Sequence, residues 1–176
     1  EICKEAQKIE HEVLKTPCGL LDQMAMMFAK KGKATLINFS DYSVEYLDLP
    51  NNWHFKLVDS GIHRSLSSTN YDKKSDYLKT HVIQENSRVK KALNASAEEL
   101  GVLLNQSHES LKLLGVSLPE IDEKVKSLQS TKGVYGARMM GGGFGGMILT
   151  LVENPEILPD YPLVSSSGSA VLKEFF

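Results

Sequence analysis

A glycine-rich segment, Gly141-Gly-Gly-Phe-Gly-Gly146, lies directly before a strongly apolar stretch, Met147–Val152. The apolar stretch has the length and the aliphatic content of a buried β-strand. Glycine loses more conformational freedom on folding than any other residue, so a run of glycines carries an entropic cost. We therefore predict that this segment turns its backbone N–H groups toward one anion of about phosphate size. The alternative is a flexible turn that only connects to the strand.

Two common phosphate-binding motifs do not fit this segment. A Walker A loop needs a Lys-Ser or Lys-Thr pair after its glycines, and none follows Gly146. A dinucleotide-binding fingerprint needs a helix after its glycines, whereas Met147–Val152 predicts a strand. The anion, if bound, must therefore be held in another way.

A second segment, Pro17-Cys-Gly-Leu-Leu-Asp-Gln23, leads into a predicted helix and places Asp22 in the first helical turn. Gly19 gives the backbone freedom just before that helix. The N-terminal end of a helix stabilises a charged carboxylate, which suits a proton acceptor or the partner of a cation. Spacing alone favours the alternative, in which Asp22 is only a favourable helix-start residue.

A third segment, His63–Tyr71, combines an Arg, several hydroxyl groups and a phenol in one loop. Such groups both donate and accept hydrogen bonds, so they suit a polyhydroxylated ligand. On these residues alone, the favoured interpretation is an elaborate helix cap with a packed Tyr71.

The predicted elements follow an α+β order. Hydrophobic periodicity predicts helices over residues 1–14, 20–29, 71–92, 96–113 and 119–128, and strands over residues 34–39, 43–49, 53–58 and 147–152. Ser96 and Glu99 have the spacing of a capping box at the start of one of these helices. Strands and helices occur in separate groups rather than in regular alternation, which is typical of the α+β class.

Composition excludes several functional classes. The net charge of −2 with scattered cations does not indicate a nucleic-acid partner. No apolar run approaches the roughly 20 residues of a membrane-spanning helix, so no membrane association is expected. Cys3 and Cys18 form no disulfide framework, and this is typical of a reducing compartment. We therefore expect a cytoplasmic protein.

Several segments together resemble the galactokinase family, part of the GHMP small-molecule kinase superfamily. Pro17–Gln23 is similar to the segment with that family's catalytic aspartate, and Val58–Tyr71 to its sugar-binding stretch. Asn105–Leu111 and Ser117–Asp122 resemble two of its helix-start motifs. Gly133–Gly146 is similar to the superfamily's third motif and has the Phe-Gly-Gly ending of galactokinases. These segments occur in family order.

The resemblance implies roles for individual residues. Asp22 corresponds to the base that takes the proton of the C1 hydroxyl of galactose, or orients that hydroxyl. Glu10 corresponds to the residue that holds magnesium, and Tyr71 to one that hydrogen-bonds the sugar. The residues implied to line the site near the phosphates are Gly141, Gly142, Gly143, Gly145 and Gly146. The implied substrates are galactose and ATP, and the implied cofactors are ATP and Mg²⁺.

The resemblance also implies a division of the chain. Residues 1–33 would be the end of an N-terminal, ribosomal-protein-S5-like kinase domain, whose helices carry the catalytic Asp. Residues 34–152 would be a ferredoxin-like GHMP kinase C-terminal domain, in keeping with the α+β class. Residues 153–176, with three prolines and a serine-rich run, are expected to form an irregular tail.

The family's N-terminal half is expected upstream of Glu1, because the chain starts within a predicted helix that has no cap. Its Gly-Glu-His-Thr-Asp-Tyr signature and its serine-rich ATP loop do not occur here. We therefore expect the isolated chain to be inactive as a kinase. Two alternatives remain: a non-catalytic galactose- and ATP-sensing relative that acts in transcriptional regulation, and a kinase for a related sugar such as N-acetylgalactosamine.

Overall fold

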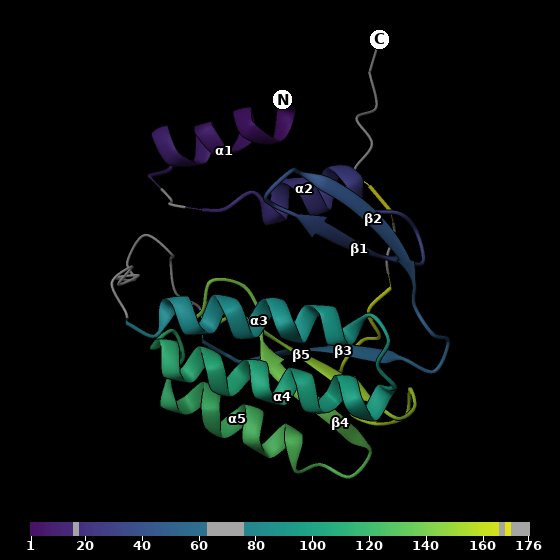
Figure 1. The fold of residues 1–176 in the computed structure, drawn as a ribbon. Helices are drawn as coiled ribbons and strands as arrows, with labels where there is room; N and C mark the ends of the chain where they lie inside the picture. Colours follow the sequence, from purple (N-terminus) through teal and green to yellow (C-terminus); the bar gives the residue numbers. More distant parts are fainter. Residues whose placement is uncertain (16–17, 63–75, 166–167, 170–176) are drawn as a thin grey trace. The chain divides into compact units, whose positions relative to one another are not determined.

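The computed structural model describes residues 1–15, 18–62, 76–165 and 168–169, and the chain divides into two compact units (Figure 1). The first unit is built from Glu1–Pro50 with the chain end from Ser165, and the second from Asn51–Val164. Residues 34–50, which the sequence places with the second domain, are therefore in the first compact unit.

Two helices and one hairpin make up the first unit. Its elements are α1 (Ile2–Glu12), α2 (Leu21–Phe28), β1 (Lys33–Asn38) and β2 (Ser43–Asp48). The two strands pair antiparallel, and their register ends at Asn38 opposite Ser43. Tyr42 takes a left-handed conformation with φ of 59° in the tight turn between them. The structure confirms the predicted helices and the predicted hairpin.

The second unit combines three helices with an antiparallel sheet in the order β3-β5-β4. Its elements are β3 (His54–Asp59), α3 (Leu78–Ala92), α4 (Ala97–Leu114), α5 (Pro119–Gln129), β4 (Val134–Met139) and β5 (Met147–Val152). Helices and strands stay in separate groups along the chain, as the sequence predicts. The predicted α+β class is confirmed.

Strand β4 and the start of α3 differ from the sequence prediction. Gly136 lies inside β4, and Gly133 directly precedes it. Glycine is depleted in strands, so the composition of this segment does not mark it as one. The predicted helix over residues 71–92 includes residues 71–75, which lie outside the described part of the chain, and α3 begins at Leu78.

The ends of α4 and α5 follow their sequence signals. Ser96 accepts a hydrogen bond from the Glu99 backbone, and the Glu99 side chain accepts one from the Ser96 backbone, so the predicted capping box is confirmed. The segment Ser117–Asp122 spans the start of α5, as expected for a helix-start motif. The same expectation is wrong for Asn105–Leu111, which lies inside α4 because the chain is already helical from Ala97.

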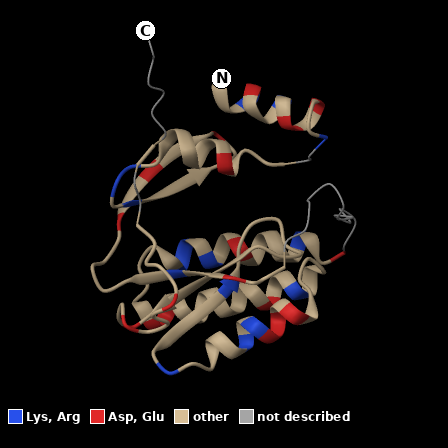
Figure 2. Cartoon of the chain, turned by 180° about the vertical axis from the view of Figure 1, so that it is seen from behind, with Lys and Arg blue, Asp and Glu red and all other residues tan. Residues whose placement is uncertain are grey.

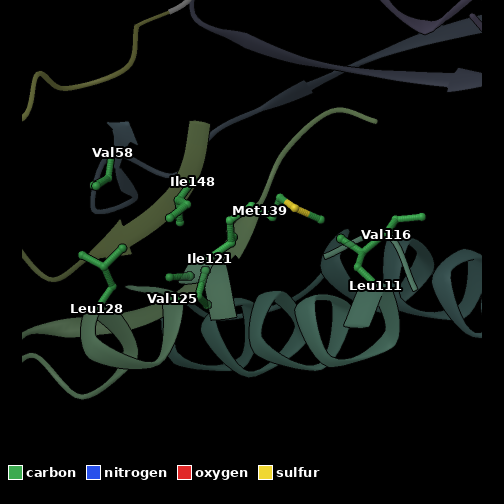
Figure 3. Packing of buried hydrophobic residues seen from close by; sticks show 9 residues of the cluster. Val58, Leu111, Val116, Ile121, Val125, Leu128, Met139 and Ile148 are labelled. Atoms are coloured by element: carbon green, nitrogen blue, oxygen red, sulfur yellow. The ribbon is translucent and has the colours of Figure 1, made fainter. Parts of the chain in front are cut away.

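Apolar side chains of α4 and α5 pack against the sheet to form the core of the second unit (Figure 3). Ile121 and Val125 of α5 and Ile148 of β5 are fully buried in this cluster. The partly buried ring of Phe144 packs against the same cluster, so the glycine-rich segment is attached to the core.

Helix α4 approaches β4 backbone to backbone. A Cβ atom on Gly136 would lie 2.1 Å from the carbonyl oxygen of Gly101, and a Cβ atom on Gly101 would lie 2.3 Å from that of Tyr135. Both distances are far below the ~3.3 Å at which a carbon atom meets a carbonyl oxygen. Glycine at these two positions is therefore what allows α4 to lie directly on β4.

At residues 163–164, within the expected irregular tail, the chain pairs with the outer edge of β3. Leu163 forms an isolated antiparallel bridge with Lys56, and the Val164 N–H donates to the carbonyl oxygen of Phe55 at 2.8 Å. Residues 166–167 and 170–176 of that tail lie outside the described part of the chain.

A buried lysine holds this segment. Lys56 is only 3% exposed, and its Nζ donates to the carbonyl oxygens of Leu158 at 3.2 Å and of Tyr161 at 2.9 Å. A buried ammonium group is tolerated only when such partners are present. Lys56 thus links β3 to the chain that crosses it.

Replacing Lys56 by alanine is expected to destabilise the complete protein by about 3 kcal/mol, because buried carbonyl groups lose their donor and the side chain leaves a cavity. Amide hydrogen exchange should rise in residues 158–164 first. Lys132→Ala, an exposed lysine of the same unit, is the control. Unfolding midpoints that do not differ between the two variants would contradict this role of Lys56.

Basic and acidic residues are interspersed along the helices of the second unit (Figure 2). Among the helices that the structure describes, none has the length and apolar content that crossing a bilayer requires.

Candidate functional site

One face of α1 fixes the segment that leads into α2. Gln7 Nε2 donates to the carbonyl oxygen of Cys18 at 3.0 Å, and the Cys18 N–H donates to His11 Nε2 at 3.1 Å. Gln7 and His11 are one helical turn apart, so their side chains lie on the same face of α1. Helix α2 has no side-chain N-cap, and these contacts from α1 hold the chain in front of it instead.

The same face of α1 carries Glu10, which contacts Gln23 of α2. Gln23 Nε2 donates to Glu10 Oε1 at 2.8 Å. Gln23 is 8% exposed, and its Oε1 is buried without a hydrogen-bond partner. Since the amide nitrogen faces the carboxylate, the amide oxygen must point elsewhere. A buried acceptor without a donor costs about 1–3 kcal/mol, so this site presents an unsatisfied oxygen close to a carboxylate.

Asp22 directly precedes Gln23, in the first turn of α2, and its side chain is exposed. The helix N-terminus favours the charged carboxylate there. The expected need for glycine before α2 is wrong. The φ of Gly19 lies outside the left-handed region, and a Cβ atom at this position would have no neighbour within 4 Å.

Cys18 lies beside these residues but is unsuited to be a nucleophile. Burial raises the pKa of the Cys18 thiol, and the hydrogen bond with Glu10 and the negative charge of Glu10 raise it further. A hydrogen bond from Gln23 Nε2 to Cys18 Sγ at 3.6 Å acts in the opposite direction and is outweighed. A thiol that stays protonated at neutral pH reacts slowly, so Cys18 serves here as a contact residue.

The glycine-rich segment connects β4 to β5 in the second unit and packs on two other backbone segments. A Cβ atom on Gly143 would lie 2.3 Å from the carbonyl oxygen of Val116, and one on Gly145 would lie 2.3 Å from that of Ile62. The Phe144 N–H donates to the Val116 carbonyl oxygen at 2.9 Å. Close backbone packing therefore explains Gly143 and Gly145, for which the sequence suggests an anion or a flexible turn.

The part of this segment that faces solvent is its first part. The Gly146 N–H donates to the carbonyl oxygen of Ile62 at 2.9 Å, so this group and the N–H of Phe144 are already used within the protein. Gly141 and Gly142 are exposed, and Gly141 has φ of 70° with open space around it. If the segment holds an anion, Gly141 and Gly142 are the positions where the anion would meet it.

A partly buried ion-pair cluster ties β4 to α3. Arg138 Nη1 donates to Glu85 Oε1 at 2.9 Å, and Arg88 Nε donates to Glu85 Oε2 at 2.7 Å. Burial by itself would raise the pKa of Glu85, but hydrogen bonds from Ser107 and Arg88 and the charge of Arg138 hold it below its ordinary value. Sequence reasoning missed this cluster because its members come from three different elements.

The structure brings only part of the predicted site together. Glu10 and the turn that contains Asp22 meet within the first unit. The glycine-rich segment belongs to the second unit. Tyr71, like the rest of the loop from His63, lies outside the described residues, as does Pro17.

Comparison with known proteins decides the family. Residues 89–158 match the family model described as GHMP kinases C terminal, a range that covers the end of α3, all of α4, α5, β4 and β5, and the turn that follows β5. This stretch is a GHMP kinase C-terminal domain. A galactokinase from Thermotoga petrophila is 35% identical over 187 residues, which cover 86% of this chain and 53% of the relative. The chain is similar to galactokinases, and it spans about half the length of the curated relatives it matches.

Solved structures agree on the fold of this chain. Lactococcus lactis galactokinase complexed with galactose matches with a TM-score of 0.69 at 19% identity, over 96% of this chain and 59% of that chain. A mevalonate kinase matches with a TM-score of 0.67 at 20% identity, over 93% of this chain and 55% of that chain. The predicted GHMP kinase fold is confirmed.

Proposed function

We propose that the complete protein is an ATP-dependent kinase that phosphorylates galactose at its C1 hydroxyl. The observation that supports this best is the hydrogen bond between Glu10 and Gln23, which places one carboxylate beside the helical turn that carries a second, Asp22. Phosphoryl transfer needs a group that positions the attacking hydroxyl and groups that neutralise phosphate charge. The name of the Thermotoga petrophila relative, a galactokinase, supports the choice of sugar.

Asp22 is assigned the role of the proton acceptor. Its carboxylate takes the proton of the sugar C1 hydroxyl, and the hydroxyl oxygen forms a bond to the γ-phosphorus of ATP. The bond between that phosphorus and the β,γ-bridging oxygen breaks, and its electron pair leaves with ADP. The position of Asp22 in the first turn of α2 supports this role, because the helix end favours its charged form.

Glu10 is assigned to Mg²⁺, which neutralises phosphate charge when bound. Magnesium is commonly held by one or two carboxylates together with substrate phosphates and water. The described residues contain no cluster of three or more His, Cys, Asp or Glu that could hold a metal ion, so a single-carboxylate site is the type that fits.

The remaining roles follow the resemblance. The glycine-rich segment is assigned to the phosphates of ATP, with Gly141 and Gly142 as the exposed positions and with Gly143, Gly145 and Gly146 holding the segment's shape. Tyr71 is assigned to the sugar.

The test is ADP formation by the purified complete protein with ATP, Mg²⁺ and either galactose or N-acetylgalactosamine. We expect galactose to be the better substrate and galactose 1-phosphate to be the product. We expect the isolated chain 1–176 to be inactive. A galactose-dependent thermal shift without turnover would instead identify a sensor, and preferred turnover of N-acetylgalactosamine would overturn the choice of sugar.

Removing the Glu10 carboxylate should change the magnesium dependence. In Glu10→Ala, the Mg²⁺ concentration for half-maximal activity is expected to rise about tenfold or more, as on loss of a group that supports a metal site. Glu12→Ala, an exposed carboxylate at the end of α1, is the matched control. The same Mg²⁺ dependence in both variants would rule out this role for Glu10.

A further inference from the structure

The outer edge of β4 is covered by side chains instead of by another strand. β4 lies at one end of the order β3-β5-β4, so every second residue turns its backbone groups away from β5. Ala137 is one such residue. Its N–H donates to Asn105 Oδ1 at 2.9 Å, and its carbonyl oxygen accepts from Gln129 Nε2 at 3.0 Å.

Met139 is the next residue of β4 that faces outward, and it is covered in the same way. Its N–H donates to His108 Nδ1 at 3.5 Å, a long contact, and its carbonyl oxygen accepts from Arg138 Nε at 3.1 Å. Asn105 and His108 are three residues apart on α4, so they share the helix face toward β4. The glycine-rich segment begins two residues after Met139.

His108 is in turn held from outside α4. It is only 2% exposed, and its Nε2 lies 3.2 Å from Asp122 Oδ1. The same oxygen accepts a hydrogen bond from Ser117 Oγ at 2.6 Å. Ser117 follows Val116, whose carbonyl oxygen binds the middle of the glycine-rich segment. His108, Asp122 and Ser117 therefore connect Met139, which precedes that segment in the chain by two residues, with Val116, which binds its middle.

The protonation of His108 agrees with these contacts. Burial lowers the pKa of His108, and this outweighs the opposing effects of the Asp122 and Glu109 carboxylates; the charge of Lys112 lowers it further. The ring is therefore neutral at pH 7. The proton belongs on Nε2, which faces Asp122, and this leaves Nδ1 free to accept from the Met139 N–H.

We propose that His108, Asp122 and Ser117 are positioning residues that hold the glycine-rich segment in the conformation that receives the phosphates of ATP. The identity of the ligand rests on the proposed function, whereas the fixing of the segment is a property of the fold. These residues act through backbone contacts at Met139 and Val116.

The experiment compares Asp122→Ala and Asp122→Asn in the complete protein. Alanine removes the oxygen that His108 Nε2 and Ser117 Oγ both contact, whereas asparagine keeps an oxygen that can accept from Ser117 and face His108. Without substrate, Asp122→Ala should speed amide hydrogen exchange across residues 139–147 about tenfold. Asp122→Asn should stay close to wild type. Glu120→Ala, which also removes a first-turn carboxylate of α5 but an exposed one, is the matched control.

Kinetics then test the link to phosphate. Asp122→Ala should raise KM for ATP about tenfold, a common effect of losing an outer partner of a site, while KM for galactose changes little. Exchange in Asp122→Ala equal to that in Glu120→Ala would overturn the positioning role. Faster exchange with an unchanged KM for ATP would overturn its functional part.

If Asp122→Ala does not fold, Ser117→Ala removes a single hydrogen bond at a half-buried position, and exchange in the same residues must rise for the proposal to stand. If the wild-type protein shows no turnover of galactose, the proposed function fails, while the exchange measurement still decides whether these residues position the segment.

Discussion

Replacing Asp22 by alanine in the complete protein is expected to lower kcat for galactose about a thousandfold, within the usual contribution of a general base. The affinity for galactose should change little, because removing one carboxylate leaves the other groups that hold the sugar in place. Asp22 is exposed in the first turn of α2, so its loss costs about 0.3–1 kcal/mol of helix-end stabilisation and the protein still folds. Single-turnover kinetics and calorimetric titration with galactose separate the two effects.

The control for Asp22→Ala is Glu98→Ala, which removes an exposed first-turn carboxylate from α4. Both variants lose a similar helix-end interaction, but only Asp22 is assigned to the reaction. Asp22→Asn keeps the shape and removes the charge, so it should be as inactive as Asp22→Ala. If either Asp22 variant keeps more than about a tenth of the wild-type kcat, the residue is not a general base of ordinary strength.

The site in the first unit was only partly predictable from sequence. A carboxylate in the first turn of a helix can be read from local signals, and Asp22 was found in this way. The contact of Glu10 with Gln23 depends on how α1 and α2 pack, and no local pattern encodes that packing. Only the family resemblance identifies Glu10 as a site residue. Gln23 belongs to the motif Pro17–Gln23, but the sequence assigns it no role of its own.

For the glycine-rich segment, the sequence identifies the feature but not the packing that explains it. The sequence offers an anion or a flexible turn as explanations of the glycines, and neither includes close packing against another backbone. For Gly143 and Gly145 the structure gives this further explanation, the close approach of the carbonyl oxygens of Val116 and Ile62. Val116 and Ile62 are distant from these glycines in sequence, so their approach cannot be inferred from the local sequence.

The same limit applies to β4 and its edge. Helices α4 and α5 were predicted almost to the residue, because capping signals and apolar periodicity are local. Strand β4 was missed because its glycine is required by α4, not by the strand itself. The roles of Asn105 and His108 likewise become clear only in the folded chain, where they accept from the backbone N–H groups of Ala137 and Met139.

The contact between α4 and β4 leads to the prediction with the largest effect on stability. Gly136→Ala is expected to lower the free energy of unfolding by about 3 kcal/mol, because overpacking a rigid contact forces the backbone to move. The new Cβ atom would lie 2.1 Å from the Gly101 carbonyl oxygen, and a helix backbone cannot yield as a side chain does. Urea-induced unfolding followed by circular dichroism measures this loss.

Gly115→Ala is the control for Gly136→Ala. Gly115 has φ of 81° but open space around its Cβ position, so alanine there meets strain without a clash. Gly115→Ala should lower the free energy of unfolding by about 1 kcal/mol.

The two variants should also differ in their effect on α4. To accept the methyl group of Gly136→Ala in β4, α4 must move away from the strand, and Asn105 and His108 move with it. Gly136→Ala should therefore also speed amide exchange in residues 137–147, whereas Gly115→Ala should not. Equal destabilisation by the two variants would show that α4 does not rest on the β4 backbone.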